Sequence, residues 1–203
     1  MQNFIKHNPE VPYCLVSDAG DDFSDLSHKY GCEYLSYDTN VGMDYLPKEH
    51  AKLLLKRLED CFNLLDVQYL ILMEDDVLCR GPVDFDFDFD LGSHYVVGNK
   101  LHLYESILKY NPTPNVDWNG ACGGAIINRI LFNERNWETM NRFFDEEFDS
   151  LGGSMDQLLT TMYLICGHEV KELTTVGILG EVNRHPNWAS TNIPIIHQYK
   201  YEY

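Results

Sequence analysis

The segment QYLILMEDDVLCRGP places an apolar run directly before three adjacent carboxylates. Residues 69–73 are apolar or aromatic, and Glu74, Asp75 and Asp76 follow them without a break. Carboxylate oxygens are hard ligands suited to Mg²⁺ or Mn²⁺, commonly one or two of them together with substrate phosphates. Alternate side chains of a strand lie on the same side, so Glu74 and Asp76 are expected to point together and Asp75 away. The pattern favours a divalent-metal site; the alternative is a turn whose acids cap the next helix or face water.

The elements before this segment alternate between strand and helix. Apolar runs end at Asp18 and Asp38, a helix is predicted for residues 24–30, and PKEHAKLLLKRLEDCFNLL has apolar residues at helical spacing. Such alternation is typical of an α/β fold with a mostly parallel central sheet covered by helices on both faces. Ligands of these sheets bind at the carboxyl ends of the strands. Since the third strand, residues 69–73, also ends in carboxylates, the sequence predicts one site at this edge.

The second half of the chain is more mixed. The alternating DFDFDFD, residues 84–90, predicts an exposed loop or edge strand with phenylalanine turned inward, and SHYVVGNKLHLY predicts a strand. WNGACGGAIINRILF predicts a glycine-rich turn that leads into another strand. Helices are predicted for residues 134–150 and 155–166, and NIPIIHQYKYEY contains a short apolar strand that runs into His197.

Composition narrows the range of partners. The chain has 203 residues, 15 of them basic and 32 acidic, for a formal net charge of -17. This charge repels nucleic acid and anionic lipid, so a phosphate ligand would need local neutralisation, most simply by a divalent cation. Most of the acids are expected to form a solvated surface. With no internal repeat and no linker rich in Gly, Pro or Ser, a single domain over residues 1–203 is predicted.

The cysteines and the start of the chain indicate a compartment. The six cysteines contain no C-x-x-C pair and mostly sit in apolar contexts, so they are expected to be reduced core thiols. MQNFIKHNPE has no apolar stretch resembling a signal peptide, and no run approaches the ~18 apolar residues of a membrane span. We therefore expect a soluble cytoplasmic protein, in the host cytoplasm if it is virus-encoded.

Several segments resemble GT-A glycosyltransferases, in the order in which that family has them. YLILMEDDVLCRGP resembles the family's DxD segment, and EVPYCLVSDAGDD resembles its early strand. WNGACGGAIINR is similar to the glycine-rich element beside the sugar, GGSMDQLLTTMYL to the acidic motif near the reacting carbon, and IIHQYK to a late His-x-x-Lys segment. Together they cover about residues 12–200.

The resemblance implies a GT-A (Rossmann-like) α/β fold. Its nucleotide-binding part would span about residues 1–90, and its acceptor and sugar part about residues 91–203. Only about ten residues precede the first predicted strand, so we expect that the family's usual first strand is missing, that another segment replaces it, or that the chain is a cut-down version.

The resemblance also implies a site for Mn²⁺ or Mg²⁺. Asp76 and His197 are the expected ligands, and Glu74 is expected either as a further ligand or at the ribose. Lys200 would add positive charge near the phosphates. Taken alone, His197 would be an ordinary surface or core histidine and Lys200 a solvated lysine.

Catalysis and sugar binding are assigned to other residues by the same resemblance. Asp156, at the start of a predicted helix, is the candidate catalytic carboxylate, as general base in an inverting enzyme or as a stabiliser of positive charge in a retaining one. The Asp156–Gln157 pair resembles retaining members and the EDD triplet inverting ones, so the stereochemical outcome stays open. Contacts to the nucleotide or sugar are expected from Asp18, Asp38, Glu74, Asp75, Trp118, Gly120, Gly123 and Gly124. The competing interpretations are a helix-capping acid, a buried tryptophan and a plain tight turn.

The implied function is metal-dependent transfer of a hexose from a nucleotide-diphosphate sugar, with UDP as the expected nucleotide, to a glycan or glycoprotein hydroxyl. A sugar-phosphate nucleotidyltransferase is a second hypothesis, but the sequence lacks the basic glycine-rich loop which that chemistry usually needs on the first strand. A nucleotide-sugar-binding module without activity is a third.

Overall fold

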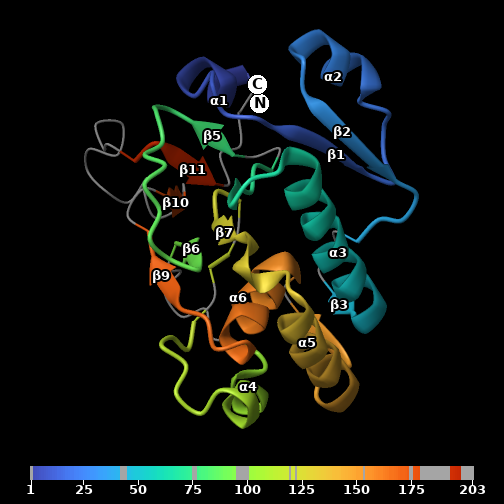
Figure 1. Cartoon of the computed structure of the whole chain (residues 1–203), viewed down its shortest axis with the longest axis vertical. Coiled ribbons are helices and arrows are strands. Elements are labelled where there is room, and N and C mark those ends of the chain that lie inside the picture. The colour runs from blue at the N-terminus through green and yellow to red at the C-terminus, as the bar shows by residue number, and fades with distance from the viewer. Residues whose placement is uncertain are drawn as a thin grey trace.

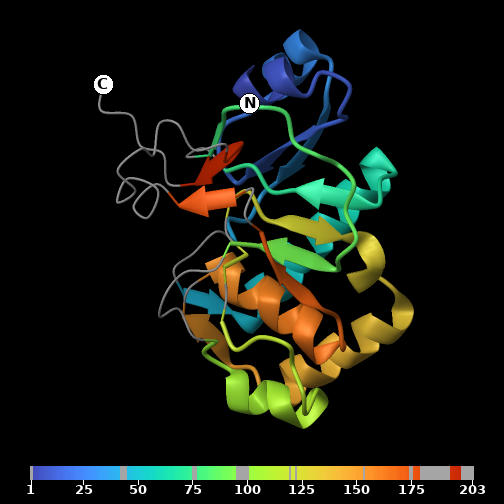
Figure 2. The same cartoon turned by 90° about the vertical axis from the view of Figure 1, so that its left-hand side faces the viewer.

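The computed structural model describes residues 2–41, 45–74, 77–94, 101–118, 120–121, 123–152, 154–173, 176–178 and 193–197. They form an α/β structure in which α2 (Ser24–Tyr30) lies at one end of the molecule and α4 (Tyr104–Tyr110) at the other (Figures 1 and 2). No described helix is long and apolar enough to cross a membrane.

The first two strands form a parallel pair. β1 (Cys14–Asp18) and β2 (Glu33–Tyr37) pair in register along their whole length, with α2 as the connection between them. α2 ends at Gly31, whose φ of 65° is a left-handed conformation that glycine adopts without strain. The predicted strand, helix and strand are confirmed here. A further helix, α1 (Gln2–His7), precedes β1.

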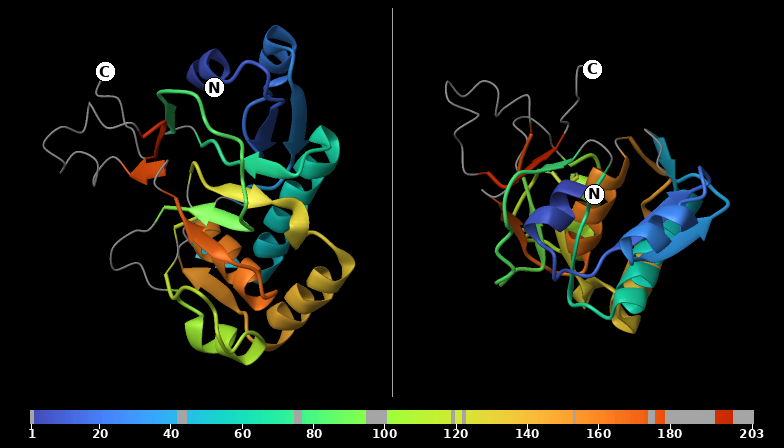
Figure 3. Two further views of the ribbon diagram at one scale, coloured as in Figure 1. Left: turned by 60° about the vertical axis from the view of Figure 1, so that its left-hand side comes forward. Right: turned by 90° about the horizontal axis from the view of Figure 1, so that it is seen from above.

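The long helix α3 (Lys48–Leu65) follows Pro47 and is closed by Asp66, which has a left-handed φ of 49°. Figure 3 shows α3 running beside the β1–β2 pair. Its buried apolar side chains recur at the predicted helical spacing: Ala51, Leu55, Leu58, Cys61 and Phe62. The helix predicted for this segment is therefore confirmed.

The largest sheet is mixed rather than mostly parallel. Its order is β4 (Tyr69–Ile71), β7 (Ile126–Asn128), β6 (Leu91–Ser93) and β9 (Val170–Glu172). β7 runs antiparallel to both β4 and β6, whereas β6 and β9 are parallel. The expectation of a mostly parallel sheet is thus met only in part among the described residues, because the predicted third strand pairs with a strand from the second half of the chain.

Short strands complete the structure. β3 (Tyr45–Pro47) pairs antiparallel with β8 (Ser150–Gly152). β11 (Ile195–His197) lies between β10 (Val176–Ile178), to which it is parallel, and β5 (Leu78–Cys79), to which it is antiparallel. Residues more than one hundred positions apart in the sequence are therefore joined where β5 meets β11.

Two apolar clusters lie on the two faces of β4. Leu70 and Leu72 pack against the larger cluster, which contains buried side chains of α3, α5 (Glu134–Glu146) and α6 (Ser154–Ile165). Tyr69, Ile71 and Met73 pack against a smaller cluster that includes Phe4, Cys79 and Ile195. β4 is thus covered on both faces, as its continuous apolar sequence predicts.

One predicted helix ends earlier in the structure, one prediction is met in one of its two alternatives, and one falls mostly outside the described residues. The helix predicted for residues 134–150 ends at Glu146, because residues 150–152 pair with β3 as a strand. Residues 84–90 form no strand, so the loop alternative of the prediction is the one observed; the Asp84 carboxylate accepts a hydrogen bond from the Asp86 N–H at 3.2 Å, a local bond that competes with sheet pairing. In this segment Phe87 and Phe89 pack inward as predicted, but Phe85 is 44% exposed. The strand predicted for SHYVVGNKLHLY falls mostly on residues 95–100, which lie outside the described residues, and α4 begins at Tyr104.

The described cysteines are free thiols: Cys14, Cys32, Cys61, Cys79 and Cys166. Cys61 and Cys79 are buried, and the other three are half-buried.

Candidate functional site

The carboxyl end of β4 lies beside the glycine-rich turn. Pairing of β4 with the β7 segment continues beyond Ile71, since the Leu72 N–H donates to the Ala125 carbonyl at 2.9 Å and the Gly124 N–H donates to the Leu72 carbonyl at 2.5 Å. Gly124 has a φ of 91°, which favours glycine. Gly123 and Gly124 therefore lie next to the residues that lead into Glu74, two motifs that are about fifty residues apart in the sequence.

Glu74 is half-buried where the chain leaves β4. The Val77 N–H donates to the Glu74 carbonyl at 3.2 Å, so the two residues that flank Asp75 and Asp76 lie close together. Asp75 and Asp76 themselves lie outside the described residues. Leu70 and Leu72, four and two residues before Glu74, pack against the larger apolar cluster.

The strand that carries His197 pairs with the strand that follows the acidic triplet. Ile195 is opposite Cys79, and Ile196 is opposite Leu78. Continued by one residue, this antiparallel register sets His197 opposite Val77, which follows Asp76 directly in the sequence. The backbone thus brings the two predicted metal-ligand segments together, while the side chain of His197 and all of Lys200 lie outside the described residues.

The first turn of α6 lies toward the same edge of the sheet. α6 has 12 residues, about 18 Å of helix, and only residues 166–169 separate it from β9. Figures 1 and 2 show α6 packed against the sheet next to β6 and β9. Because so short a turn reverses the chain, α6 begins near the edge where β4, β6 and β9 end. Asp156 is half-buried in this first turn, and the buried Gln157 side chain accepts a hydrogen bond from the His102 N–H at 3.0 Å.

Gly120 belongs to this edge as well. A Cβ on Gly120 would lie 1.7 Å from the carbonyl oxygen of His94, the residue that follows β6. Trp118, half-buried, packs against the larger apolar cluster. The close approach of two backbones requires glycine at position 120, whatever ligand the site holds.

We expect Gly120→Ala to destabilise the fold by more than about 2 kcal/mol, because a backbone carbonyl cannot move away as a flexible side chain could. Urea unfolding followed by circular dichroism measures the loss. Gly20→Ala is the matched control, since a Cβ there meets no atom within 4 Å, and its midpoint should stay close to that of the wild type. Equal midpoints for the two variants would contradict the proposed backbone contact.

Asp18 ends β1 in a clamp of polar contacts. One of its carboxylate oxygens pairs with the Arg57 guanidinium, and the other accepts a hydrogen bond from the Val41 N–H at 2.9 Å. Arg57 also donates to the Thr39 carbonyl at 2.6 Å and lies 4.4 Å from the centre of the Tyr37 ring. These contacts fix the end of β1 to the loop that follows β2. Asp38, the first residue of that loop, is exposed.

Arg57 is the functional candidate that sequence reasoning missed. Its side chain is 7% exposed, and its Nε has no hydrogen-bond partner among the described residues. Burial lowers the pKa of the Arg57 guanidinium, although an arginine stays charged in proteins. The sequence does contain a feature that could have identified Arg57: it lies on the apolar stripe of α3, three residues after Leu54 and four before Cys61. A cation at such a position indicates an anionic partner beside the helix.

The predicted residues thus form two groups. Glu74, Gly120, Gly123, Gly124 and the first turn of α6 gather at the edge where β4 and β6 end. Asp18 and Asp38 lie at the end of the β1–β2 pair, whose strands do not pair with β4 in the part of the chain that the structure describes. Among the described residues no group of three or more His, Cys, Asp or Glu side chains is arranged to hold a metal ion.

The arrangement of sheets and helices resembles that of a glycosyltransferase structure of the GT-A fold. In particular, the chain is similar to the crystal structure of the galactosyltransferase LgtC in complex with donor and acceptor sugar analogues, with a TM-score of 0.53. The match covers 97% of this chain and 80% of the LgtC chain, at 11% sequence identity, so it shows the fold alone. No protein-family model matches the sequence, and no curated protein sequence does.

Proposed function

We propose that the chain is a metal-dependent glycosyltransferase that moves a hexose from a nucleotide-diphosphate sugar, with UDP as the nucleotide, to a hydroxyl of a glycan or glycoprotein. The observation that carries the proposal is the hydrogen bonding of the Gly123–Gly124 turn to Leu72, in the segment that leads from β4 to Glu74, within a fold that resembles a glycosyltransferase. Glycine lacks a Cβ, so a sugar can approach this turn closely beside the acidic triplet.

Mn²⁺ or Mg²⁺ would be held by Asp76 and His197, with Glu74 as a further ligand or a contact to ribose. Carboxylate donors suit these cations. The register of β5 with β11 supports the pairing of the two segments. When bound, the cation stabilises the departing diphosphate as a Lewis acid. Lys200, three residues after His197, would add positive charge for the phosphates.

The nucleotide would lie against the loop that follows β2. Asp38 is exposed there and the Asp18 side chain is 32% exposed, so both carboxylates are placed where a base or ribose could donate hydrogen bonds to them. The clamp around Arg57 would hold this loop in shape before the nucleotide binds. Trp118 would offer a face for the sugar.

Asp156 is the proposed catalytic carboxylate. It lies in the first turn of α6, where the helix dipole favours its ionised form. In an inverting reaction it would take the proton of the acceptor hydroxyl; in a retaining one it would stabilise positive charge on the sugar. The anomeric configuration of the product, measured by NMR, decides between these roles.

The proposal is tested by incubating the wild-type chain with UDP-hexoses, other nucleotide sugars and a panel of sugar acceptors, with Mn²⁺, Mg²⁺ or EDTA. We expect release of UDP that depends on the cation and is lost in EDTA. Release of pyrophosphate from a nucleoside triphosphate and a sugar phosphate would instead identify a nucleotidyltransferase. Donor binding in calorimetry without turnover on any acceptor or water would identify a binding module.

A further inference from the structure

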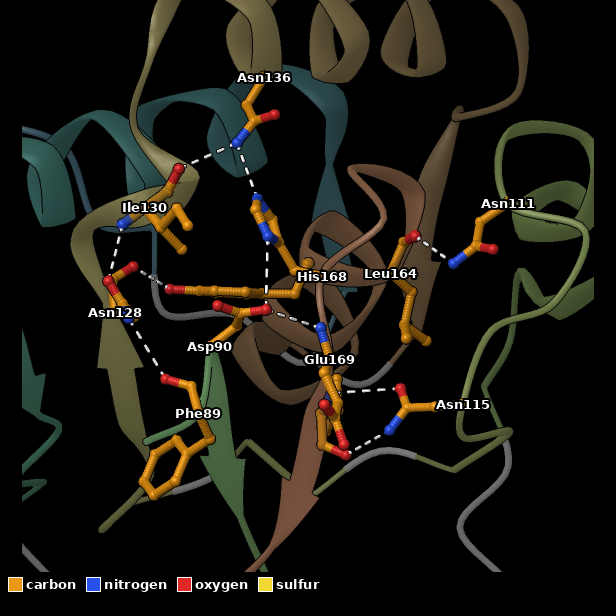
Figure 4. Close-up of polar contacts among 12 residues, drawn as sticks. Phe89, Asp90, Asn111, Asn115, Asn128, Ile130, Asn136, Leu164, His168 and Glu169 are labelled. Carbon is orange, nitrogen blue, oxygen red and sulfur yellow. Dashed lines mark hydrogen bonds and ion pairs between the residues drawn. The ribbon is translucent and has the colours of Figure 1, made fainter. Parts of the chain in front are cut away.

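A second polar cluster lies at the other edge of the sheet, where β4, β6 and β9 begin, and the proposed reaction does not use it. His168, in the turn between α6 and β9, lies at its centre (Figure 4). Its Nε2 is 2.9 Å from the Asn136 Nδ2, and its Nδ1 is 3.5 Å from a carboxylate oxygen of Asp90. One imidazole therefore joins α5, the start of β6 and the turn before β9.

The contacts of Asn136 determine which imidazole nitrogen carries the proton. The Asn136 Nδ2 also donates to the Ile130 carbonyl at 3.0 Å, so the side-chain amide presents its N–H groups to both partners. Nε2 of His168 must then be the unprotonated acceptor. The proton of a neutral imidazole belongs on Nδ1, toward Asp90, whose same oxygen accepts a hydrogen bond from the Glu169 N–H at 2.9 Å.

The surroundings disfavour a second proton on this ring. The His168 side chain is 14% exposed, and burial lowers its pKa although the Asp90 carboxylate acts in the opposite direction. From α6, Tyr163 places its ring 5.9 Å away and donates its hydroxyl to the Asn128 carbonyl at 2.5 Å, which ties the end of β7 to the same cluster.

Among the described residues, two titratable groups have interactions with this ring. Asp90, ahead of β6, acts electrostatically on the imidazole, and Tyr163 of α6 packs its ring against it. Cys166 at the end of α6 interacts with Tyr163, Arg135 of α5 interacts with Cys166, and Glu169 is the next residue in the chain. Asp90 is the one carboxylate within ion-pair distance of the imidazole among the described residues. A protonated imidazole would form an ion pair with Asp90 across 3.5 Å. It would also carry an N–H on Nε2, which would point at the N–H of the Asn136 side chain.

We propose that His168 is a pH-sensitive lock on this edge of the sheet. In its neutral Nδ1–H form it holds the start of α5 to the turn before β9, and a proton on Nε2 breaks the bond to Asn136 and loosens that attachment. The lock is independent of the proposed transferase activity, since it involves none of the residues assigned to the site.

The direction in which stability changes with pH follows from the protons bound by the folded and the unfolded chain. The unfolded chain takes up a proton on this histidine below a pH of about 6.5, whereas the folded chain resists it. The unfolded state thus binds more protons over the pH range just below about 6.5, and stability falls there as the pH falls. The unfolding equilibrium constant rises by up to about tenfold for each pH unit in this range.

The test compares urea unfolding of the wild type and His168→Gln between pH 7.5 and pH 5. Glutamine keeps an acceptor for Asn136 but takes up no proton, so its midpoint should lose the part of the pH dependence that belongs to His168. His28→Gln is the matched control, because His28 is exposed on α2, and it should keep the wild-type profile. Identical pH profiles for the wild type and His168→Gln would overturn the lock.

Two further measurements test the lock even if His168→Gln folds poorly. In ¹⁵N-NMR spectra of the wild type at pH 7.5 the His168 ring should be the Nδ1–H tautomer, and the Nε2–H tautomer would refute the assignment. Asn136→Asp sets a carboxylate against Nε2, so its stability relative to the wild type should rise as the pH falls; a relative stability that falls would also refute it.

Discussion

Replacing Asp76 with asparagine is expected to lower cation-dependent release of UDP by about 1,000-fold, the largest effect on activity that we predict. Asparagine keeps the shape of the side chain but removes the charge that a divalent cation needs from its ligand. A Lewis acid at a diphosphate contributes several kcal/mol to the transition state, and each 1.4 kcal/mol is about tenfold in rate. Turnover is measured at saturating donor, and Mn²⁺ affinity by titration calorimetry with and without UDP.

The control is Asp86→Asn, which makes the same change of charge at an exposed carboxylate in the segment that follows β5. It should leave turnover and Mn²⁺ affinity as in the wild type. His197→Gln should act in the same direction as Asp76→Asn, and the double variant should lose less than the two single losses combined, because both residues would hold one ion. Wild-type Mn²⁺ affinity in Asp76→Asn would exclude this carboxylate from the metal site.

The helices and strands that are determined by residues close together in the sequence were predictable. The apolar positions of α3 recur every three or four residues, and the short runs before Asp18 and Asp38 are bounded by turn residues, so these elements lie where the sequence sets them. The pairing of β4 with β7 was not predictable in the same way. Which strand lies next to β4 depends on contacts between residues more than fifty positions apart, and alternation of strand and helix suggested a parallel neighbour instead.

The same distinction between local sequence and long-range contacts applies to the candidate site. The acidic triplet and the glycine-rich turn were each recognisable from local sequence, and their order suggested that they meet. The register that sets the His197 strand against the strand after Asp76 is a property of the folded chain, because it joins segments about 120 residues apart. Arg57 was missed for a related reason: a charged residue on a helix is usually solvated, and only the fold shows that Asp18 faces it.

Arg57→Met is expected to destabilise the fold by about 3 kcal/mol, because it leaves the Asp18 carboxylate, which is 32% exposed, without its cation. The Thr39 carbonyl also loses its donor, so the loop after β2 loses its attachment to α3. If this loop receives the nucleotide, UDP affinity should fall by at least about tenfold in the same variant, a loss of about 1.4 kcal/mol. Denaturant unfolding and UDP titration measure the two effects separately.

Companion variants separate the clamp from a general loss of charge. Arg129→Met removes an arginine whose partner Asp66 is 94% exposed, and such a surface pair contributes at most about 1 kcal/mol. Arg57→Lys keeps the charge but not the planar fork that reaches Asp18 and Thr39 together, so it should fall between the wild type and Arg57→Met in both measurements.

In Asp18→Asn the further change Arg57→Met should cost less than in the wild type, because the anion that the guanidinium neutralises is already absent. If Arg57→Met unfolds at the same urea concentration as Arg129→Met, the buried guanidinium does not hold the ends of β1 and β2 together, and the loop must be ordered by other contacts.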